Sequence, residues 1–266
     1  MISSFGAMMA IAFLVCNYLL KRDLKSIGQD PMIGEGITLR AVLGGIIGAK
    51  IYYLIENIAT GKSADNINGL GTIISGIFTL DIGRIGEGIQ NFGGGLVFLG
   101  GLIGGMIAVT IYIRKMNLQW LEVADWVAPY LALGHGIGRI GCFLVGDDWG
   151  TPSDLPWAIG FPDGMDPTPQ GTTVHPTQIY EMIAYFSVFL YLCYRRQKKN
   201  FTGELMFEYL FLAGIARFMI EFIRNNPKYL IGLSGAQYIS IIMIIVGTYQ
   251  MWNLRRKAGA VLKKMD

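Results

Sequence analysis

Long apolar runs alternate with short polar segments along most of this chain. A helix needs about 20 mostly apolar residues to cross the hydrocarbon of a bilayer. Seven runs approach this length, and they cover residues 4–20, 37–58, 92–113, 121–145, 177–194, 205–223 and 235–253. The pattern predicts an all-α polytopic membrane protein of about seven transmembrane helices, and residues 1–266 are interpreted as a single transmembrane domain.

Basic residues are concentrated on alternate connections between these runs. Residues 21–36, 114–120, 195–204 and the C-terminal tail together contain fourteen lysines and arginines, whereas the remaining connections contain four. Cytoplasmic segments carry the excess of basic residues in membrane proteins. We therefore expect the N-terminus outside and the C-terminus in the cytoplasm. The first run has no basic segment before it, so we expect a retained helix rather than a signal peptide.

Two connections on the predicted outer side are long, at about residues 59–91 and 146–176. The first contains an apolar stretch, residues 69–80, that is too short to span and is expected at the membrane interface. The second contains six prolines and no lysine or arginine, and six prolines exclude a regular helix. Its apolar positions favour an ordered loop on the membrane surface; they are Leu155, Trp157, Ile159 and Phe161.

Composition agrees with a membrane protein and excludes several other classes. Only 15% of the residues are charged and the mean hydropathy is +0.44, whereas soluble domains carry about 25% charge. A net charge of +3 is too modest to indicate a nucleic-acid partner. Three widely spaced cysteines and two histidines show no metal-ligand spacing, so we expect neither a metal nor a cofactor.

Four basic residues fall inside the predicted spans. Arg40 and Lys50 lie where their side chains can reach the nearer interface. Arg139 and Arg217 are placed deeper, and an arginine near the centre of a spanning helix costs about 2.5–3.5 kcal/mol even on lenient scales. Such a residue is expected to face the interior of the bundle or a watery cavity and to serve a function.

Acidic residues could accompany both arginines. Glu221 is four residues after Arg217 and Arg224 is seven after it, so all three share one helix face. Asp125 could pair with Arg139 only across helices. The structural alternative is an internal salt bridge that holds the bundle. Because the planar guanidinium binds phosphate oxygens bidentately and stays charged, we favour a phosphate ligand that enters from the membrane, such as a phospholipid headgroup.

Two further stretches are unusual for membrane helices. Glycines recur around Arg139, including Gly138 and Gly141, and allow a ligand or a neighbouring helix to approach closely. Gly100 and Gly101 in the third run are also consistent with simple helix packing. Residues 175–181 place several polar groups at the outer end of the fifth run, whose alternative reading is a helix cap at Thr177; the candidate site residues there are His175, Gln178, Tyr180 and Glu181.

These motifs, in this order, resemble the bacterial prolipoprotein diacylglyceryl transferases. The similarity extends over nearly the whole chain, from Ser4-Phe5-Gly6 to Leu233-Ser234-Gly235-Ala236-Gln237 at the last run. The segments between them that carry it are residues 93–104, 138–150, 175–181 and 217–224. The resemblance implies transfer of a diacylglyceryl group from phosphatidylglycerol to the lipobox cysteine thiol of a prolipoprotein, with glycerol phosphate as the leaving group.

The resemblance also implies a location and a set of site residues. We expect a multi-pass protein of the bacterial cytoplasmic (inner) membrane that contacts membrane lipid and prolipoprotein signal peptides. Arg139 and Arg217 match the key arginines of the family and are expected to bind the headgroup and stabilise the leaving group. The other expected catalytic residues are His175 and Glu181. The expected substrate-binding residues are Arg139, Gly138, Gly141, Asp148, Gln178, Tyr180, Glu221, Arg224, Gly100, Gly101 and Asp125.

Three positions depart from the family pattern. Leu99 replaces a usual histidine, Cys142 replaces a usual asparagine, and residues 145–148 shorten the usual Asn-Gly-Glu while keeping an acidic group. Without the histidine, the proton acceptor for the thiol stays open between His175, Glu181 and direct ionisation in the arginine field. The alternatives to a transferase are a diverged, non-catalytic lipid-binding member of the same family and an anion transporter.

Overall fold

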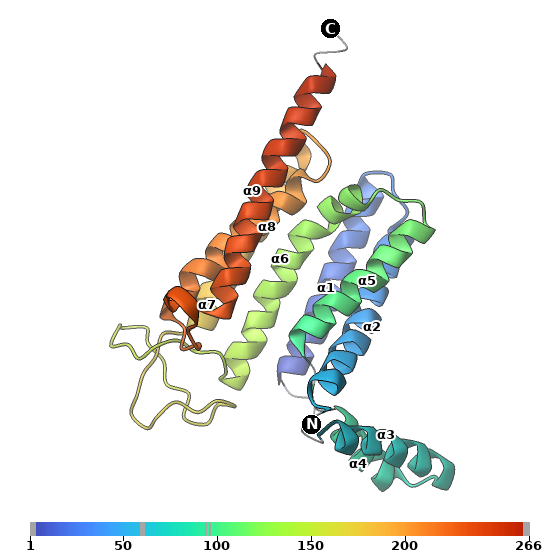
Figure 1. Ribbon diagram of the computed structural model, residues 1–266, viewed down its shortest axis with the longest axis vertical. Coiled ribbons are helices and arrows are strands. Elements are labelled where there is room, and N and C mark those ends of the chain that lie inside the picture. Colours follow the sequence, from blue (N-terminus) through green and yellow to red (C-terminus); the bar gives the residue numbers. More distant parts are fainter. Residues whose placement is uncertain (1–3, 59–61, 94, 96, 263–266) are drawn as a thin grey trace. The chain divides into compact units, whose positions relative to one another are not determined.

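The structure is a computed structural model that describes residues 4–58, 62–93, 95 and 97–262 (Figure 1). Within these ranges the chain is helical and contains no strand, which confirms the predicted all-α class. Its α-helices are α1 (Ser4–Ser26), α2 (Pro31–Glu56), α3 (Lys62–Thr79), α4 (Ile82–Gly93), α5 (Phe98–Lys115), α6 (Trp120–Val145), α7 (Thr177–Arg195), α8 (Glu204–Ile220) and α9 (Gly235–Leu262). Short 3-10 helices follow α7 and α8 and precede α9; they are η1 (Arg196–Lys198), η2 (Glu221–Ile223) and η3 (Leu230–Gly232).

Each of the seven predicted spans coincides with a helix, although some ends differ. The third begins at Phe98 rather than residue 92, and the sixth ends as an α-helix at Ile220. By length and composition, α1, α2 and α5 are long and apolar enough to cross a membrane. The number of spans and the orientation of the chain stay predictions.

The predicted connection at residues 59–91 is largely helical, because it contains α3 and most of α4. These two helices pack against each other as a hairpin. The turn between them places Leu80 at a positive φ of 52°. The Asp81 carboxylate then accepts hydrogen bonds from the backbone N–H groups of Gly83 and Arg84, so it caps the first turn of α4.

The chain forms two compact units, one of Met1–Pro31 with Gln119–Asp266 and one of Met32–Leu118. In the second unit, glycines bring α2 and α5 into close contact. A Cβ atom on Gly48 would lie 2.3 Å from the carbonyl oxygen of Gly100, and one on Gly104 would lie 2.3 Å from that of Gly44. Such contacts are typical of helices that associate in a membrane.

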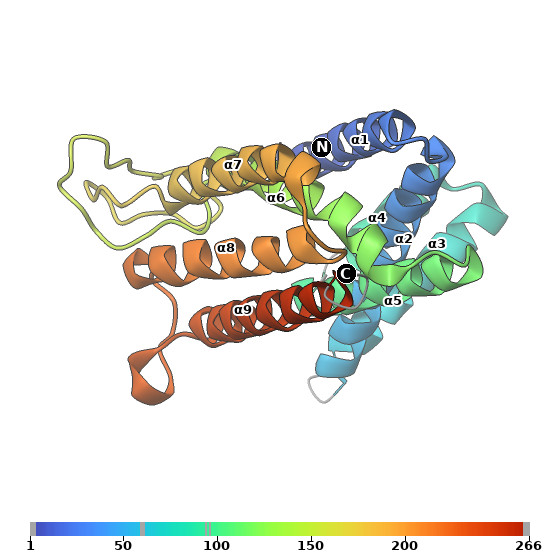
Figure 2. The ribbon, with the colours of Figure 1, turned by 90° about the horizontal axis from the view of Figure 1, so that it is seen from above.

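In the first unit, α6 packs against α1, α7 and α8, and α8 packs along α9 (Figures 1 and 2). Its buried core lies where α6, α7 and α8 meet. Alanines at the contact allow the helices to approach, and larger apolar side chains fill the remaining space. The buried core residues are Ala128, Ala132, Tyr185, Val188, Leu192, Leu205 and Ala213.

Large apolar side chains cover the outer faces of the helices. Leu14 on α1 is 69% exposed, Leu190 on α7 is 65% exposed and Ile245 on α9 is 61% exposed. Large apolar side chains exposed on so many helices are unfavourable in water and indicate contact with lipid. The chain is a membrane protein.

The proline-rich connection between α6 and α7 contains no helix, as its sequence predicts. Backbone hydrogen bonds fold it back on itself: Ile159 and Val174 each donate to the other's carbonyl, at 3.1 and 3.0 Å. The connection projects from the end of the unit at which α6 ends and α7 begins (Figure 2). Thr151 N–H donates to the carbonyl of Ile223 at 2.8 Å, which ties the connection to the end of η2.

Candidate functional site: a buried arginine–carboxylate network

Glu181, in the second turn of α7, is the centre of the candidate site. Its side chain is 0% exposed, and three arginines and a histidine surround its carboxylate. Arg139 Nε lies 2.6 Å from Oε2, while Arg217 Nη1 and Arg224 Nη1 lie 2.5 and 3.1 Å from Oε1. One buried carboxylate therefore joins α6, α7 and the end of α8.

Asp148 connects two of the same arginines at the start of the proline-rich connection. Its oxygens accept hydrogen bonds from Arg139 Nη1 at 2.6 Å and Arg224 Nη2 at 2.5 Å. Its side chain is 42% exposed, so this edge of the network faces outward. Burial alone would raise the pKa of the Asp148 carboxyl, but Arg224 and Arg139 outweigh burial and hold this pKa below its ordinary value.

Glu221 forms the third carboxylate position, and its side chain is also 0% exposed. Arg217 Nη2 lies 3.1 Å from Oε2, which confirms the predicted pairing at four residues' spacing. Its Oε1 accepts hydrogen bonds from Asn226 Nδ2 at 2.6 Å and from Ser234 Oγ at 2.7 Å. Glu221 therefore anchors the network to the segment that leads into α9.

The three arginines differ in how far they are available to a ligand. Arg224 is 4% exposed and has contacts to all three carboxylates, so it acts as part of the scaffold. Arg139 and Arg217 are 14% and 20% exposed. Among the described residues, Nη2 of Arg139 has no hydrogen-bond partner. This nitrogen offers two N–H groups to an anion that reaches the site.

The start of α7 fixes the acidic residues of the connection. Gln178 Nε2 donates to the carbonyl of Asp147 at 2.6 Å, and Thr177 Oγ donates to the carbonyl of Asp148 at 2.7 Å. Both side chains are fully buried. Asp148 itself has a positive φ of 62°, a conformation that aspartate tolerates better than most residues. Gln178 thus holds the backbone of Asp147, and Thr177 holds that of Asp148.

His175 and Tyr180 lie in a second cluster, away from the three arginines. The Tyr180 hydroxyl accepts a hydrogen bond from Trp157 Nε1 at 2.7 Å and lies 3.3 Å from His175 Nδ1. These contacts fasten the proline-rich connection to α7. The structure therefore brings Glu181 to the arginine network but leaves His175 and Tyr180 beside the connection.

The predicted glycines have packing roles. A Cβ atom on Gly141 would lie 3.1 Å from the Phe5 ring, whereas one on Gly138 would meet only the sulfur of Met9 at 3.7 Å. Both glycines face α1. Gly100 and Gly101 lie on α5 in the other unit, where their contacts are with α2.

Asp125, predicted as a candidate partner of Arg139, makes its contacts elsewhere. Its carboxylate accepts hydrogen bonds from the backbone N–H groups of Gly203 at 2.8 Å and Met206 at 3.1 Å. Lys199 Nζ lies 3.3 Å from the same group. These are the contacts of an N-terminal cap on α8, so the structure gives Asp125 a structural role away from the site.

The sequence reasoning missed His135, which the structure places inside the network. Its Nε2 lies 3.3 Å from Glu181 Oε2, and its ring stacks on Tyr185 with centroids 3.7 Å apart. The available signal was its position four residues before Arg139, which puts both side chains on one face of α6.

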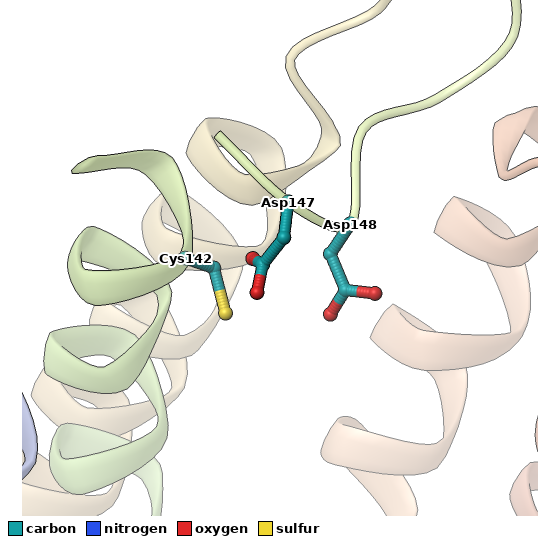
Figure 3. Close-up of side chains that lie close together, drawn as sticks. All are labelled: Cys142, Asp147 and Asp148. Carbon is teal, nitrogen blue, oxygen red and sulfur yellow. The ribbon is translucent and has the colours of Figure 1, made fainter. Parts of the chain in front are cut away.

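Cys142, Asp147 and Asp148 present three potential metal-ligand atoms within 4.8 Å of one another (Figure 3). Arg139 Nη1 lies 3.6 Å from the Cys142 sulfur and 2.6 Å from Asp148. A guanidinium inside the cluster neutralises its charge and competes for its oxygens. The residues present therefore fit an arginine-bridged cluster better than a cation site.

Fold and site together define a class: a helical membrane protein with a buried arginine–carboxylate network in which Arg139 and Arg217 are partly exposed. The profile of the prolipoprotein diacylglyceryl transferase family matches residues 1–253. The chain belongs to this family, as its motifs indicated.

Several relatives are named phosphatidylglycerol–prolipoprotein diacylglyceryl transferase. One from Clostridium tetani is 32% identical over 256 residues, which cover 96% of this chain and 94% of the relative. One from Finegoldia magna is 37% identical over 231 residues, 83% of this chain and 90% of the relative. One from Clostridioides difficile is 34% identical over 256 residues, 95% of this chain and 91% of the relative.

Proposed function

We propose that this protein transfers a diacylglyceryl group from phosphatidylglycerol to the lipobox cysteine thiol of a prolipoprotein. Family membership and the names of its relatives support this activity. The observation that carries it in this chain is the pair Arg139 and Arg217, which are held on Glu181 inside a membrane protein and are still partly exposed. An anionic headgroup is the ligand that such guanidinium groups favour.

The membrane placement is proposed from charge. We infer seven spans with the N-terminus outside, in the bacterial cytoplasmic (inner) membrane, so that the proline-rich connection faces the external side. This connection contains no lysine or arginine, whereas residues 195–204, which join α7 to α8, contain four. The site would then lie near the outer leaflet, within reach of secreted precursors and their signal peptides.

The reaction needs positioning and charge stabilisation more than a nucleophile of the enzyme. The precursor's thiolate attacks the glyceryl carbon that bears the phosphate ester; a carbon–sulfur bond forms while the carbon–oxygen bond breaks. The electron pair of the broken bond leaves on an oxygen of glycerol phosphate. Arg139 and Arg217 bind the phosphate and stabilise the charge that develops on this oxygen.

The remaining network residues hold the two arginines in place. Glu181 and Glu221 fix Arg217 from two sides, while Glu181 and Asp148 fix Arg139. A guanidinium held by two carboxylates loses little conformational freedom when the phosphate arrives, which favours binding. Arg224, which is buried, contacts all three carboxylates and neutralises part of their charge.

Mass spectrometry of a reconstituted reaction tests the proposal. The protein in vesicles containing phosphatidylglycerol is incubated with a precursor peptide that carries a lipobox cysteine. The peptide should gain the mass of one diacylglyceryl unit, and a matched peptide with serine at that position should gain none. Lipid binding without a mass gain would instead support a diverged, non-catalytic member, and anion flux without a mass gain would support a transporter.

A further inference from the structure

Among the described residues, His135 is the histidine that borders the arginines of the network. Its ring lies between Glu181 and Arg139 and stacks on Tyr185, with an angle of 16° between the ring planes. Its side chain is 30% exposed, whereas the Glu181 side chain is 0% exposed. The imidazole is therefore held rigidly and is also accessible.

Two neighbours of Nε2 favour opposite tautomers of the His135 ring. Arg139 Nε donates a hydrogen bond to Nε2 at 3.4 Å when Nε2 carries the lone pair. Glu181 Oε2, at 3.3 Å, belongs to an ionised carboxylate that can only accept, so it pairs with the tautomer that has a hydrogen on Nε2. A proton acceptor at Nδ1 requires this second tautomer, in which Nε2 donates to Glu181. The lone pair then resides on Nδ1, which has no hydrogen-bond partner among the described residues.

The other candidate proton acceptors are engaged. Glu181 is surrounded by three guanidinium groups, and Asp148 accepts from two. Guanidinium groups therefore already occupy the oxygens of both carboxylates. His175 is tied to Tyr180 at the proline-rich connection. Leu99, on α5, has no group that can accept a proton.

We propose that His135 is a catalytic residue that accepts the proton of the precursor thiol; this inference rests on the proposed transferase function. The S–H proton passes to Nδ1, and the thiolate then forms the carbon–sulfur bond as the carbon–oxygen bond breaks. Glu181 stabilises the resulting imidazolium through the Nε2 hydrogen. The imidazolium finally returns its proton to the departing glycerol phosphate or to water.

The arrangement follows the logic of a nucleophile–histidine–carboxylate triad, except that the substrate supplies the nucleophile. The charged and titratable groups that face His135 are Glu181 and Tyr185 from α7, Arg139 from α6 and Arg217 from α8. Arg139 would thus bind the lipid phosphate one helical turn from the base. The lipid phosphate at Arg139 and the precursor thiol at His135 would then meet on one face of α6.

The test compares the wild-type protein with His135→Asn in vesicles containing phosphatidylglycerol, using the lipobox peptide. Asparagine can still donate to Glu181 but cannot accept the thiol proton. At pH 7 we expect kcat to fall by about 100-fold or more, with little change in KM for the lipid. A thiol with a pKa of about 8.5 ionises without help at pH 9.5, so the deficit should shrink there.

A second variant separates catalysis from folding. His135→Ala leaves a space beside Tyr185, and added imidazole should restore transfer, because the free base replaces the missing ring. A His135→Asn variant with wild-type kcat at pH 7 would overturn the inference, as would an equal deficit at both pH values together with no imidazole rescue. A wild-type protein that transfers nothing would overturn the proposed function itself, which distinguishes the two failures.

Discussion

Arg217 and Glu181 form an ion pair of 2.5 Å between α8 and α7, and the Glu181 side chain is 0% exposed. These residues are 36 positions apart in the chain, so only the packing of the two helices brings them together. The same carboxylate also binds Arg139 and Arg224. Glu181 therefore determines where the guanidinium groups of the site are held.

Replacing the central carboxylate should damage both stability and activity. Glu181→Gln leaves three arginines around a neutral amide, and breaking a buried ion pair by removing one partner costs about 3–5 kcal/mol. We expect a large drop in the unfolding midpoint and loss of diacylglyceryl transfer. Glu208→Gln is the matched control, because the Glu208 carboxylate is bound by a single arginine, Arg195. An equal effect of both variants would contradict the central role of Glu181.

The Asp148 ion pairs predict a specific dependence of stability on pH. Its pKa in the folded protein is lower than in the unfolded chain, so its contribution is complete above the unfolded value of about 3.9 and is lost as pH falls through the folded value. The wild-type protein should therefore unfold at a higher temperature than Asp148→Asn from pH 8 to pH 5. The difference should shrink below about pH 4; a difference that persists undiminished at pH 3 would contradict this account.

Close backbone contact at Gly150 predicts sensitivity to a single methyl group. A Cβ atom there would lie 2.5 Å from the carbonyl oxygen of Ile223. Gly150→Ala should push the connection away from η2, cost about 1–3 kcal/mol and lower transfer by displacing Asp148. A Cβ atom on Gly235 would lie 4.0 Å from its nearest neighbour, the Tyr229 ring, so the control Gly235→Ala should behave like the wild type. Thermal unfolding and the transfer assay together check the pair of variants.

Asp125 allows a test that separates a helix cap from a ligand site. Asp125→Ala removes the acceptor for the N–H groups of Gly203 and Met206, and the loss of a cap costs about 0.5–2 kcal/mol. We expect lower thermal stability with unchanged affinity for phosphatidylglycerol vesicles. Weaker lipid binding at unchanged stability would restore the sequence-based prediction that Asp125 binds substrate.

The sequence predicted the helices better than the site. The lengths of the apolar runs located seven helices, because a helix that crosses a bilayer needs about 20 mostly apolar residues in succession. It missed the hairpin of α3 and α4, since glycine-rich helices of this length resemble loops and the turn depends on Leu80 and the Asp81 cap. The predicted pairing of Arg217 with Glu221 was confirmed because it is local, at four residues' spacing.

Long-range relationships could not be predicted from spacing alone. Arg139 and Arg217 were expected inside the bundle because of their cost in hydrocarbon, but their shared partner was not identifiable, since Glu181 lies on a third helix. His135 was overlooked because one histidine in a glycine-rich helix gives no sign that a carboxylate from another helix reaches it. Asp125 was placed near the site because nothing in the sequence shows that it caps a helix begun 79 residues later.

The most direct test of the account is the release of glycerol phosphate by the wild-type protein and by Arg139→Lys. Lysine keeps the positive charge but cannot contact Glu181, Asp148 and a phosphate together, because its ammonium is a point charge without the planar fork. The measurement uses vesicles of phosphatidylglycerol, the lipobox peptide and quantification of glycerol phosphate beside the modified peptide. We predict one glycerol phosphate for each modified thiol in the wild type and loss of both products in Arg139→Lys. Equal release by the two proteins would contradict the claim that Arg139 clamps the lipid phosphate.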